Sequence, residues 1–224
     1  MFDTLVLLTG SAEQSLLAPV LRGRKPELRI VPVVTADQLH AVSVADLHRA
    51  RLVAFVSDVI VPAHILSSAR YGAFNFHPGS PEYPGWAPAH FALYERAERF
   101  GATFHAMAER VDTGPIFDVD DFRVAPNTTV LELEEMTYAY LARMFWRWAE
   151  VLANQAENLT PRTTMRWRDK KNSRRAYESL CNIPLDISKE DLARRMSVFG
   201  HNHYGIMPSI NLHGFEFRAA ALPH

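Results

Sequence analysis

Two polar side chains, Asn75 and His77, interrupt the apolar stretch "GAFNFH" at residues 72–77. In a strand, residues two positions apart point to the same face, so these side chains would lie together while the neighbouring phenylalanines point the other way. The next seven residues, "PGSPEYP", hold three prolines and a glycine, which favours an abrupt exit from the strand into a stiff loop. Many α/β enzymes present a site in this way at a strand's carboxyl end, although a half-buried strand with satisfied polar groups has the same pattern.

The elements that would position these side chains alternate along the chain. Strand-like apolar runs occupy residues 4–9, 28–34, 52–57 and 72–77, and helix-compatible segments lie between them at 12–23, about 43–50 and from Pro62 onward. Beyond the proline-rich loop, the sequence fits a helix at 87–99, two strands joined by a turn at 101–124, and a long helix at 128–155. This alternation predicts βαβ units. We therefore expect an α/β fold with a Rossmann-like, mostly parallel sheet.

The composition changes after the long helix and suggests three parts. Residues 158–176 hold seven Lys or Arg and one Asp, which fits a solvated connector or a segment that contacts the phosphates of a substrate. The remainder fits a helix capped by Ser188 and a hairpin that turns at His213–Gly214. The expected division is a domain at 1–157, a basic connector at 158–176 and a small helix-plus-hairpin unit at 177–224.

Charge and composition exclude several classes of function. A net charge of -1 disfavours a nucleic-acid partner, which normally requires a basic excess. Cys181 is the single cysteine, so no disulfide framework or thiolate metal cluster is expected. His201 and His203 resemble a metal-binding pair but have no acidic residue at ligand spacing, so we expect no metal. The sequence shows no membrane helix or signal peptide, and a cytoplasmic location is the default.

The stretch from 74 to 117 resembles the signature of the folate-dependent formyltransferases, the superfamily of glycinamide ribonucleotide transformylase, methionyl-tRNA formyltransferase and the sugar N-formyltransferases. Its elements occur in order: Asn-x-His-Pro, a proline-rich loop with Tyr-Pro-Gly, a His after a Gly-x-Thr strand, and Asp-x-Gly-Pro. A weaker resemblance extends to "SDVIVPAHIL" at 57–66 and to the strand order, so it covers about two thirds of the chain. The resemblance implies a folate-dependent N-formyltransferase with 10-formyltetrahydrofolate as co-substrate.

The resemblance also implies three catalytic residues. Asn75 would donate its amide hydrogen to the formyl oxygen, and His77 would supply a second hydrogen bond or a proton to that oxygen. Asp112 would orient the imidazole and accept the proton of the amine through a water. This chemistry needs such groups because attack of an amine on an amide builds an oxyanion and releases a proton. On its own, Asp112 could instead bond the backbone of its own turn.

Binding residues follow from the same resemblance. The pterin would rest on backbone groups of Asp58, Val59 and Ile60 and of the turn around Val111. The acceptor would contact the first loop and the region of the catalytic strands, at Gly10, Ser11, Tyr83, Gly85 and His105. The first loop has one glycine, which leaves phosphate binding there open, and His105 fits strand packing equally well.

The acceptor is expected to be a small-molecule amine, with a nucleotide-linked amino sugar favoured. The loop "GSPEYPG" differs from the Ser-Leu-Leu-Pro common in relatives, the large additional domain of tRNA formyltransferases is not expected here, and the charge is near neutral. The expected partners exclude nucleic acid and membrane, and a homodimer is compatible with the sequence. The alternatives are an acceptor of the glycinamide ribonucleotide type, hydrolysis of 10-formyltetrahydrofolate to formate, a non-catalytic binding module, and a metal enzyme using His77, His105 and Asp112.

Overall fold

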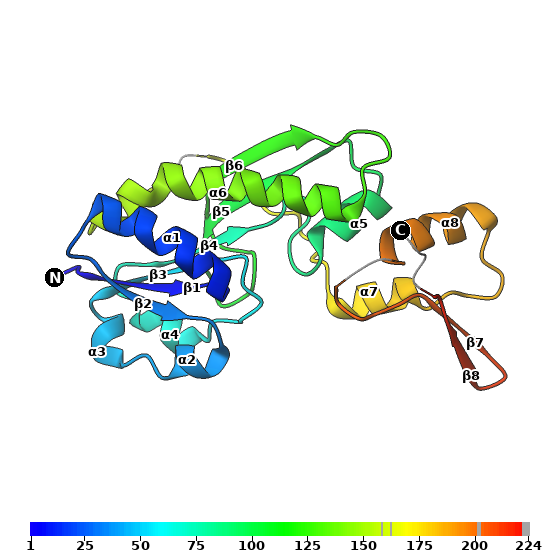
Figure 1. The fold of residues 1–224 in the computed structure, drawn as a ribbon, viewed down its shortest axis with the longest axis horizontal. Coiled ribbons are helices and arrows are strands. Elements are labelled where there is room, and N and C mark those ends of the chain that lie inside the picture. The colour runs from blue at the N-terminus through cyan, green and yellow to red at the C-terminus, as the bar shows by residue number, and fades with distance from the viewer. Residues whose placement is uncertain (158, 162, 201–202, 221–224) are drawn as a thin grey trace.

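A six-stranded sheet forms the centre of the molecule (Figure 1), which a computed structural model describes for residues 1–157, 159–161, 163–200 and 203–220. The strands are β1 (Thr4–Leu8), β2 (Arg29–Val33), β3 (Ala50–Phe55), β4 (Ala73–His77), β5 (Arg99–Ala106) and β6 (Ile116–Arg123). Their order is β2-β1-β3-β4-β5-β6. The first four pair in parallel, and β5 and β6 add to β4 as antiparallel strands. This confirms the predicted α/β fold with a mostly parallel sheet.

Helices cover both faces of the sheet. Helices α1 (Ser11–Arg24) and α6 (Val130–Asn154) lie on one face, and the short helices α2 (Ala36–His40), α3 (Val44–Leu47) and α4 (Ala63–Ser68) lie on the other (Figure 1). The central strands β1 and β3 therefore bury both of their faces, which explains their continuous apolar runs. The capping box between Thr129 and Glu132 fixes the start of α6. Among the described residues, no helix combines the length and apolar composition needed to cross a bilayer.

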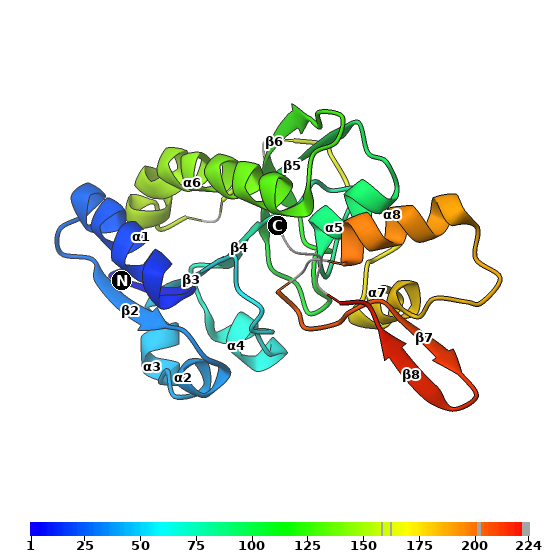
Figure 2. The ribbon, with the colours of Figure 1, turned by 45° about the vertical axis from the view of Figure 1, so that its right-hand side comes forward.

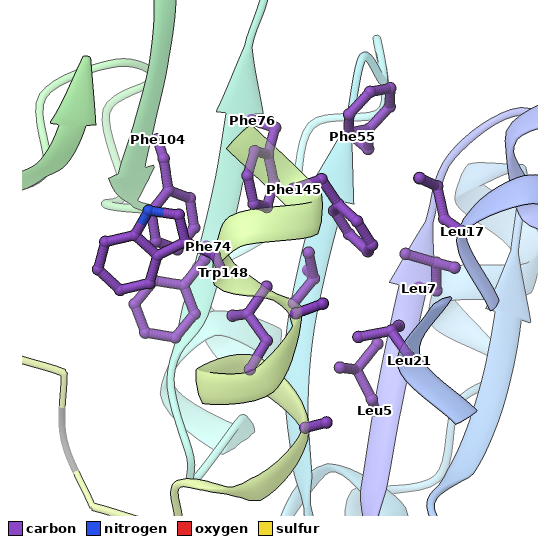
Figure 3. Close-up of a cluster of buried hydrophobic side chains, with 14 of the residues drawn as sticks. Leu5, Leu7, Leu17, Leu21, Phe55, Phe74, Phe76, Phe104, Phe145 and Trp148 are labelled. Atoms are coloured by element: carbon purple, nitrogen blue, oxygen red, sulfur yellow. The ribbon is translucent and has the colours of Figure 1, made fainter. Parts of the chain in front are cut away.

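An aromatic core holds β4 in place (Figure 3). The ring of Phe76 lies 4.5 Å from that of Phe104 on β5 and 5.2 Å from that of Phe145 on α6. Trp148 packs on Phe104 from the same helix, at 4.7 Å. Burial of each such side chain contributes about 1.5–3 kcal/mol. Because Phe74 and Phe76 face this core, the alternating residues of β4 must face the opposite side of the sheet.

A buried arginine ties α6 to the sheet, a contact that the sequence pattern did not predict. Arg51 on β3 is inaccessible to solvent and donates to the carbonyl oxygens of Val151, Leu152 and Gln155 at the end of α6. Burial lowers the pKa of Arg51 to about 10. The cation lies at the negative end of the helix dipole, which compensates its loss of hydration.

The C-terminal part packs beside α5 (Pro88–Tyr94), as Figures 1 and 2 show. It contains α7 (Arg174–Cys181), α8 (Lys189–Phe199) and a hairpin of β7 (Ser209–Leu212) and β8 (Phe215–Arg218). The expected helix and hairpin are therefore present, and the last residues of the basic stretch already belong to α7. The division into three parts stays a proposal.

Candidate active site

The two polar residues of β4 share a face, as their spacing predicted. Asn75 lies opposite His105 across the antiparallel β4–β5 pair, and His77 lies opposite Thr103. Directly opposed residues of neighbouring strands point to the same side of a sheet. The sheet therefore brings an amide and two imidazoles together near the carboxyl end of β4.

The imidazole of His105 connects Asn75 to the backbone. Its Nδ1 lies 2.7 Å from the carbonyl oxygen of Ala106, and its Nε2 lies 3.2 Å from Nδ2 of Asn75. Because a carbonyl oxygen only accepts, Nδ1 of His105 carries a proton, and Nε2 accepts from the Asn75 amide when it carries none. Asn75 thereby uses one of its two amide hydrogens and keeps the other for a ligand.

His77 is held between a loop and a carboxylate. Its Nε2 donates to the carbonyl oxygen of Tyr83 at 3.2 Å, and its Nδ1 lies 3.5 Å from Oδ2 of Asp112. The side chain is 5% exposed. Burial lowers the pKa of His77, and the Asp112 carboxylate opposes this effect in part. Protonation of Nδ1 would place an N–H donor against the carboxylate, so a proton taken up here is held at that nitrogen.

Asp112 is an anion inside the cluster that it forms with Asn75, His77 and His105. Its Oδ2 accepts a hydrogen bond of 2.7 Å from the backbone N–H of Gly85, and its Oδ1 lies 3.4 Å from Nε2 of His105. Burial alone would raise the pKa of Asp112, but the two imidazoles and the Gly85 N–H outweigh burial and hold the pKa below its ordinary value. The carboxylate thus bonds the proline-rich loop, which is a different interaction from the bond to its own turn that the sequence also allowed.

The proline-rich loop supplies backbone groups to the cluster. Tyr83 offers its carbonyl to His77, while its own ring is buried against Phe100 at 5.9 Å. Gly85 has a φ of +96°, and a Cβ at this position would collide with the backbone oxygen of Asn172. Glycine is therefore required both for the backbone conformation and for the close approach of residues near 172.

Residues 165–172 lie along this loop and do not form a free linker. The N–H of Arg168 donates to Pro81, the N–H of Asn172 donates to Pro84, and the N–H of Trp86 donates to Asn172, with distances of 2.8–3.1 Å. Arg168 also pairs with Glu95 at 2.8 Å. The basic stretch is thus built into the surroundings of the site.

Two cavities meet at Asp112. A larger one, of about 790 Å³, lies between residues 109–116 and residues 165–171. A smaller one, of about 70 Å³, is lined by Asn75, His105 and the loop after β3, including Val59 and Ile60. Three residues line both cavities: Glu109, Val111 and Asp112. A group bound in one cavity would meet a group bound in the other beside the Asp112 carboxylate.

Comparison with known proteins agrees with this geometry. Residues 35–144 match the sequence model of the formyl transferase family. These residues belong to the formyltransferase superfamily. Methionyl-tRNA formyltransferase of Geobacillus thermodenitrificans is 30% identical over 139 residues, which is 55% of this chain and 44% of that protein. The counterpart from Chlorobium chlorochromatii is 36% identical over 112 residues, or 46% of this chain and 34% of that protein. The chain thus spans less than half the length of these curated relatives.

Solved formyltransferase structures share the fold over nearly the whole chain. A sugar N-formyltransferase from a Shewanella species has a TM-score of 0.77 at 14% identity, covering 98% of this chain and 96% of the other. An N-formyltransferase from Helicobacter canadensis, solved with folinic acid and dTDP-3-aminofucose, has a TM-score of 0.66 at 16% identity. It covers 96% of this chain and 85% of the other. At 14% and 16% sequence identity, the structural similarity establishes that these proteins share the fold of this chain.

Some of the binding residues that the superfamily resemblance implied line one of the two cavities, and others do not. Val59, Ile60 and Val111 line the smaller cavity, whereas Asp58 is exposed and outside its lining. Gly10 and Ser11 begin α1, and neither lines either of the two cavities. Their assignments to the pterin and to the acceptor remain predictions.

Trp167 is a residue of the site that the sequence interpretation missed. Its ring centroid lies 4.8 Å from that of His105 and 5.5 Å from that of His77, and its Nε1 donates to the carbonyl of Gly114 at 2.9 Å. The only signal in the sequence was an aromatic residue inside the basic stretch.

Histidines elsewhere have an acidic neighbour that sequence spacing did not reveal. Nδ1 of His203 and Nδ1 of His90 each lie 3.8 Å from the carboxylate of Glu134 on α6. Within the part of the chain that the structure describes, no group of three or more His, Cys, Asp or Glu is arranged to hold a metal ion. His201 lies outside the described residues.

Proposed function

We propose that this chain transfers the formyl group of 10-formyltetrahydrofolate to an amine of a small molecule, with a nucleotide-linked amino sugar as the favoured acceptor. The observation that carries the proposal is the cluster of Asn75, His77, His105 and Asp112 at the junction of two cavities. Superfamily membership of residues 35–144 supports the reaction type.

The chemistry follows from the protonation states of the cluster. In the proposal, the second amide hydrogen of Asn75 donates to the formyl oxygen as negative charge develops there. His77 donates to the same oxygen once its Nε2–H leaves the Tyr83 carbonyl, a rearrangement that substrate binding would bring about. Asp112 is ionised and lines both cavities, so it can take the proton that the attacking amine releases.

The smaller cavity is the proposed position of the folate's reactive end. It is lined by Asn75 and His105 on one side and by the loop from Ser57 to Val61 on the other. That loop leaves β3 through Val56, which has a φ of +46°. A left-handed conformation is costly for a β-branched residue and is commonly found at ligand sites. The folate derivatives in solved structures of the same fold favour this assignment.

The larger cavity is the proposed acceptor site. Its lining includes Arg110, Arg166 and Lys171 as well as Arg168, whose charge is paired with Glu95. A few cations suffice for a phosphate-bearing small molecule, whereas a tRNA acceptor draws on many phosphate contacts and a basic surface. The net charge of -1 therefore favours the small acceptor.

The test is product analysis with purified protein and 10-formyltetrahydrofolate. Candidate acceptors are dTDP-3-amino and dTDP-4-amino sugars, glycinamide ribonucleotide and methionyl-tRNA, each assayed by mass spectrometry for the gain of one formyl group. We expect formylation of an amino sugar nucleotide. Formate release without a formylated amine would replace transfer by hydrolysis, and efficient formylation of the tRNA alone would refute the small-molecule assignment.

A further inference from the structure

Trp167 lies outside the stretch that matches the family, which ends at residue 144, yet it contacts the centre of the site. Its ring meets the imidazoles of His77 and His105 edge to face, at interplanar angles of 80° and 83°. Trp167 lines the larger cavity, whereas neither imidazole does. The indole therefore stands between the space proposed for the acceptor and the two histidines.

The same side chain holds the turn that carries Asp112. The indole N–H donates to the carbonyl of Gly114, two residues after the carboxylate. After Trp167, Arg168 and Asn172 are hydrogen-bonded through their backbones to the proline-rich loop. That loop in turn bonds His77 through Tyr83 and Asp112 through Gly85. Residues 167–172 thus connect the proline-rich loop to the turn that carries Asp112.

We propose that Trp167 is a positioning residue that fixes the two imidazoles and the Asp112 turn, and that it shields the formyl group from water in the larger cavity. This inference rests on the proposed function for the identity of the reaction. The side chains of His77 and His105 are only 5% and 2% exposed, and the half-buried indole covers them on the cavity side. Removal of the ring would open them to solvent.

Water competes with the amine for the same carbon. Hydrolysis adds water to the formyl carbon of 10-formyltetrahydrofolate, breaks the bond from that carbon to N10, and releases formate while N10 takes up a proton. Transfer breaks the same bond but leaves the formyl group on the amine. A covered site favours transfer because the amine is held in place while bulk water is excluded.

The first experiment compares Trp167→Ala and Trp167→Phe with the wild type, using 10-formyltetrahydrofolate and a dTDP-amino sugar. We expect Trp167→Ala to lower kcat by on the order of 10- to 100-fold through misplacement of the cluster. It should also raise the amount of formate released per formylated amine. Trp167→Phe keeps a ring against the imidazoles and should restore most of kcat and the product ratio. Trp146→Ala and Trp146→Phe, at a tryptophan on α6 that is 60% exposed, are the matched controls.

A second readout does not depend on the reaction. Burial lowers the pKa of His77, while Asp112, His105, Lys171 and the Tyr83 carbonyl also act on it. Opening the site relieves burial, so an NMR titration without substrate should show a higher pKa for His77 in Trp167→Ala than in the wild type or Trp167→Phe.

An unchanged His77 titration in folded Trp167→Ala, or a kcat and product ratio equal to those of the wild type, would overturn the positioning role. Absence of formyl transfer by the wild type would instead refute the proposed function. The titration would still decide the role of Trp167.

Discussion

Replacement of Gly85 by alanine tests whether residues 167–172 and the proline-rich loop hold the site together. Gly85 has a φ of +96°, and its added Cβ would collide with the backbone oxygen of Asn172 and approach the side chain of Lys171. Its N–H also donates to Asp112. The substitution therefore strains the loop and separates it from the neighbouring segment at the point where the loop bonds the carboxylate.

The expected cost has two parts. A left-handed conformation costs about 1–2 kcal/mol for a residue with a Cβ. To relieve the collision, the chain must give up the hydrogen bonds from Asn172 to Pro84 and from Trp86 to Asn172, at about 0.5–1.5 kcal/mol each. The sum is about 2–5 kcal/mol. For a chain of this size, each kcal/mol lowers Tm by roughly 2–4 °C.

Two other glycines separate the conformational cost from the cost of the collision. Gly205 and Gly214 have φ values of +71° and +85°, and a Cβ at either would meet no atom of the described part of the chain within 4 Å. Gly205→Ala and Gly214→Ala therefore carry the conformational cost without the collision. Urea and thermal denaturation should place Gly85→Ala well below both controls in stability, with a fall in formyl transfer. If Gly85→Ala and the controls were equally stable, the close contact between Gly85 and Asn172 would contribute nothing to the stability of the fold.

Three further predictions concern charge. Asp112→Asn removes the charge that opposes the effect of burial on His77, so the pKa of His77 falls further. If protonated His77 acts in the reaction, the limb of kcat that declines with rising pH moves to lower pH; an unmoved limb contradicts the coupling. Arg166→Gln and Lys171→Gln should each raise the acceptor KM a few-fold, about 0.5–1 kcal/mol, without changing the folate KM. Lys170→Gln, outside the cavity lining, is the control, and equal effects at all three positions would refute a phosphate contact. His90 is inaccessible, its ring nitrogens have no hydrogen-bond partner among the described residues, and burial lowers its pKa to about 3. The unfolded chain binds the extra proton below about pH 6.5, so stability falls between pH 6.5 and about 3, by up to roughly 5 kcal/mol. His90→Leu should flatten this dependence in urea denaturation followed across that pH range, and an unchanged slope would assign the loss to other groups.

Local patterns predicted the elements that carry the central residues. The two-residue period of β4 placed Asn75 and His77 on one face, and Phe74 and Phe76 pointed the other way as expected, into the core. The long helix predicted at 128–155 formed as α6, with Thr129 as its cap. These features depend on neighbours in the chain, which is why periodicity and capping suffice to predict them.

Long-range packing produced the features that were not predicted. Trp167 reaches Gly114 across 53 positions of the sequence, and Arg51 reaches the end of α6 across about 100. Glu134 approaches His203 because α6 and the C-terminal part meet in space. The bond between Asp112 and Gly85 depends on the path of a proline-rich loop with no regular period. No spacing rule encodes these contacts, because each depends on how separate elements dock.

The most direct test of the proposed reaction is a single-turnover assay with 10-formyltetrahydrofolate carrying a carbon-13 formyl group and a dTDP-amino sugar. We expect the label to appear on the amine of the sugar in the wild type. Asn75→Ala and His77→Ala should each slow this step by about 10²–10³-fold, the cost of one oxyanion donor, with folate binding nearly unchanged. Label transfer at the wild-type rate in both variants would contradict the assignment of Asn75 and His77 to the formyl oxygen.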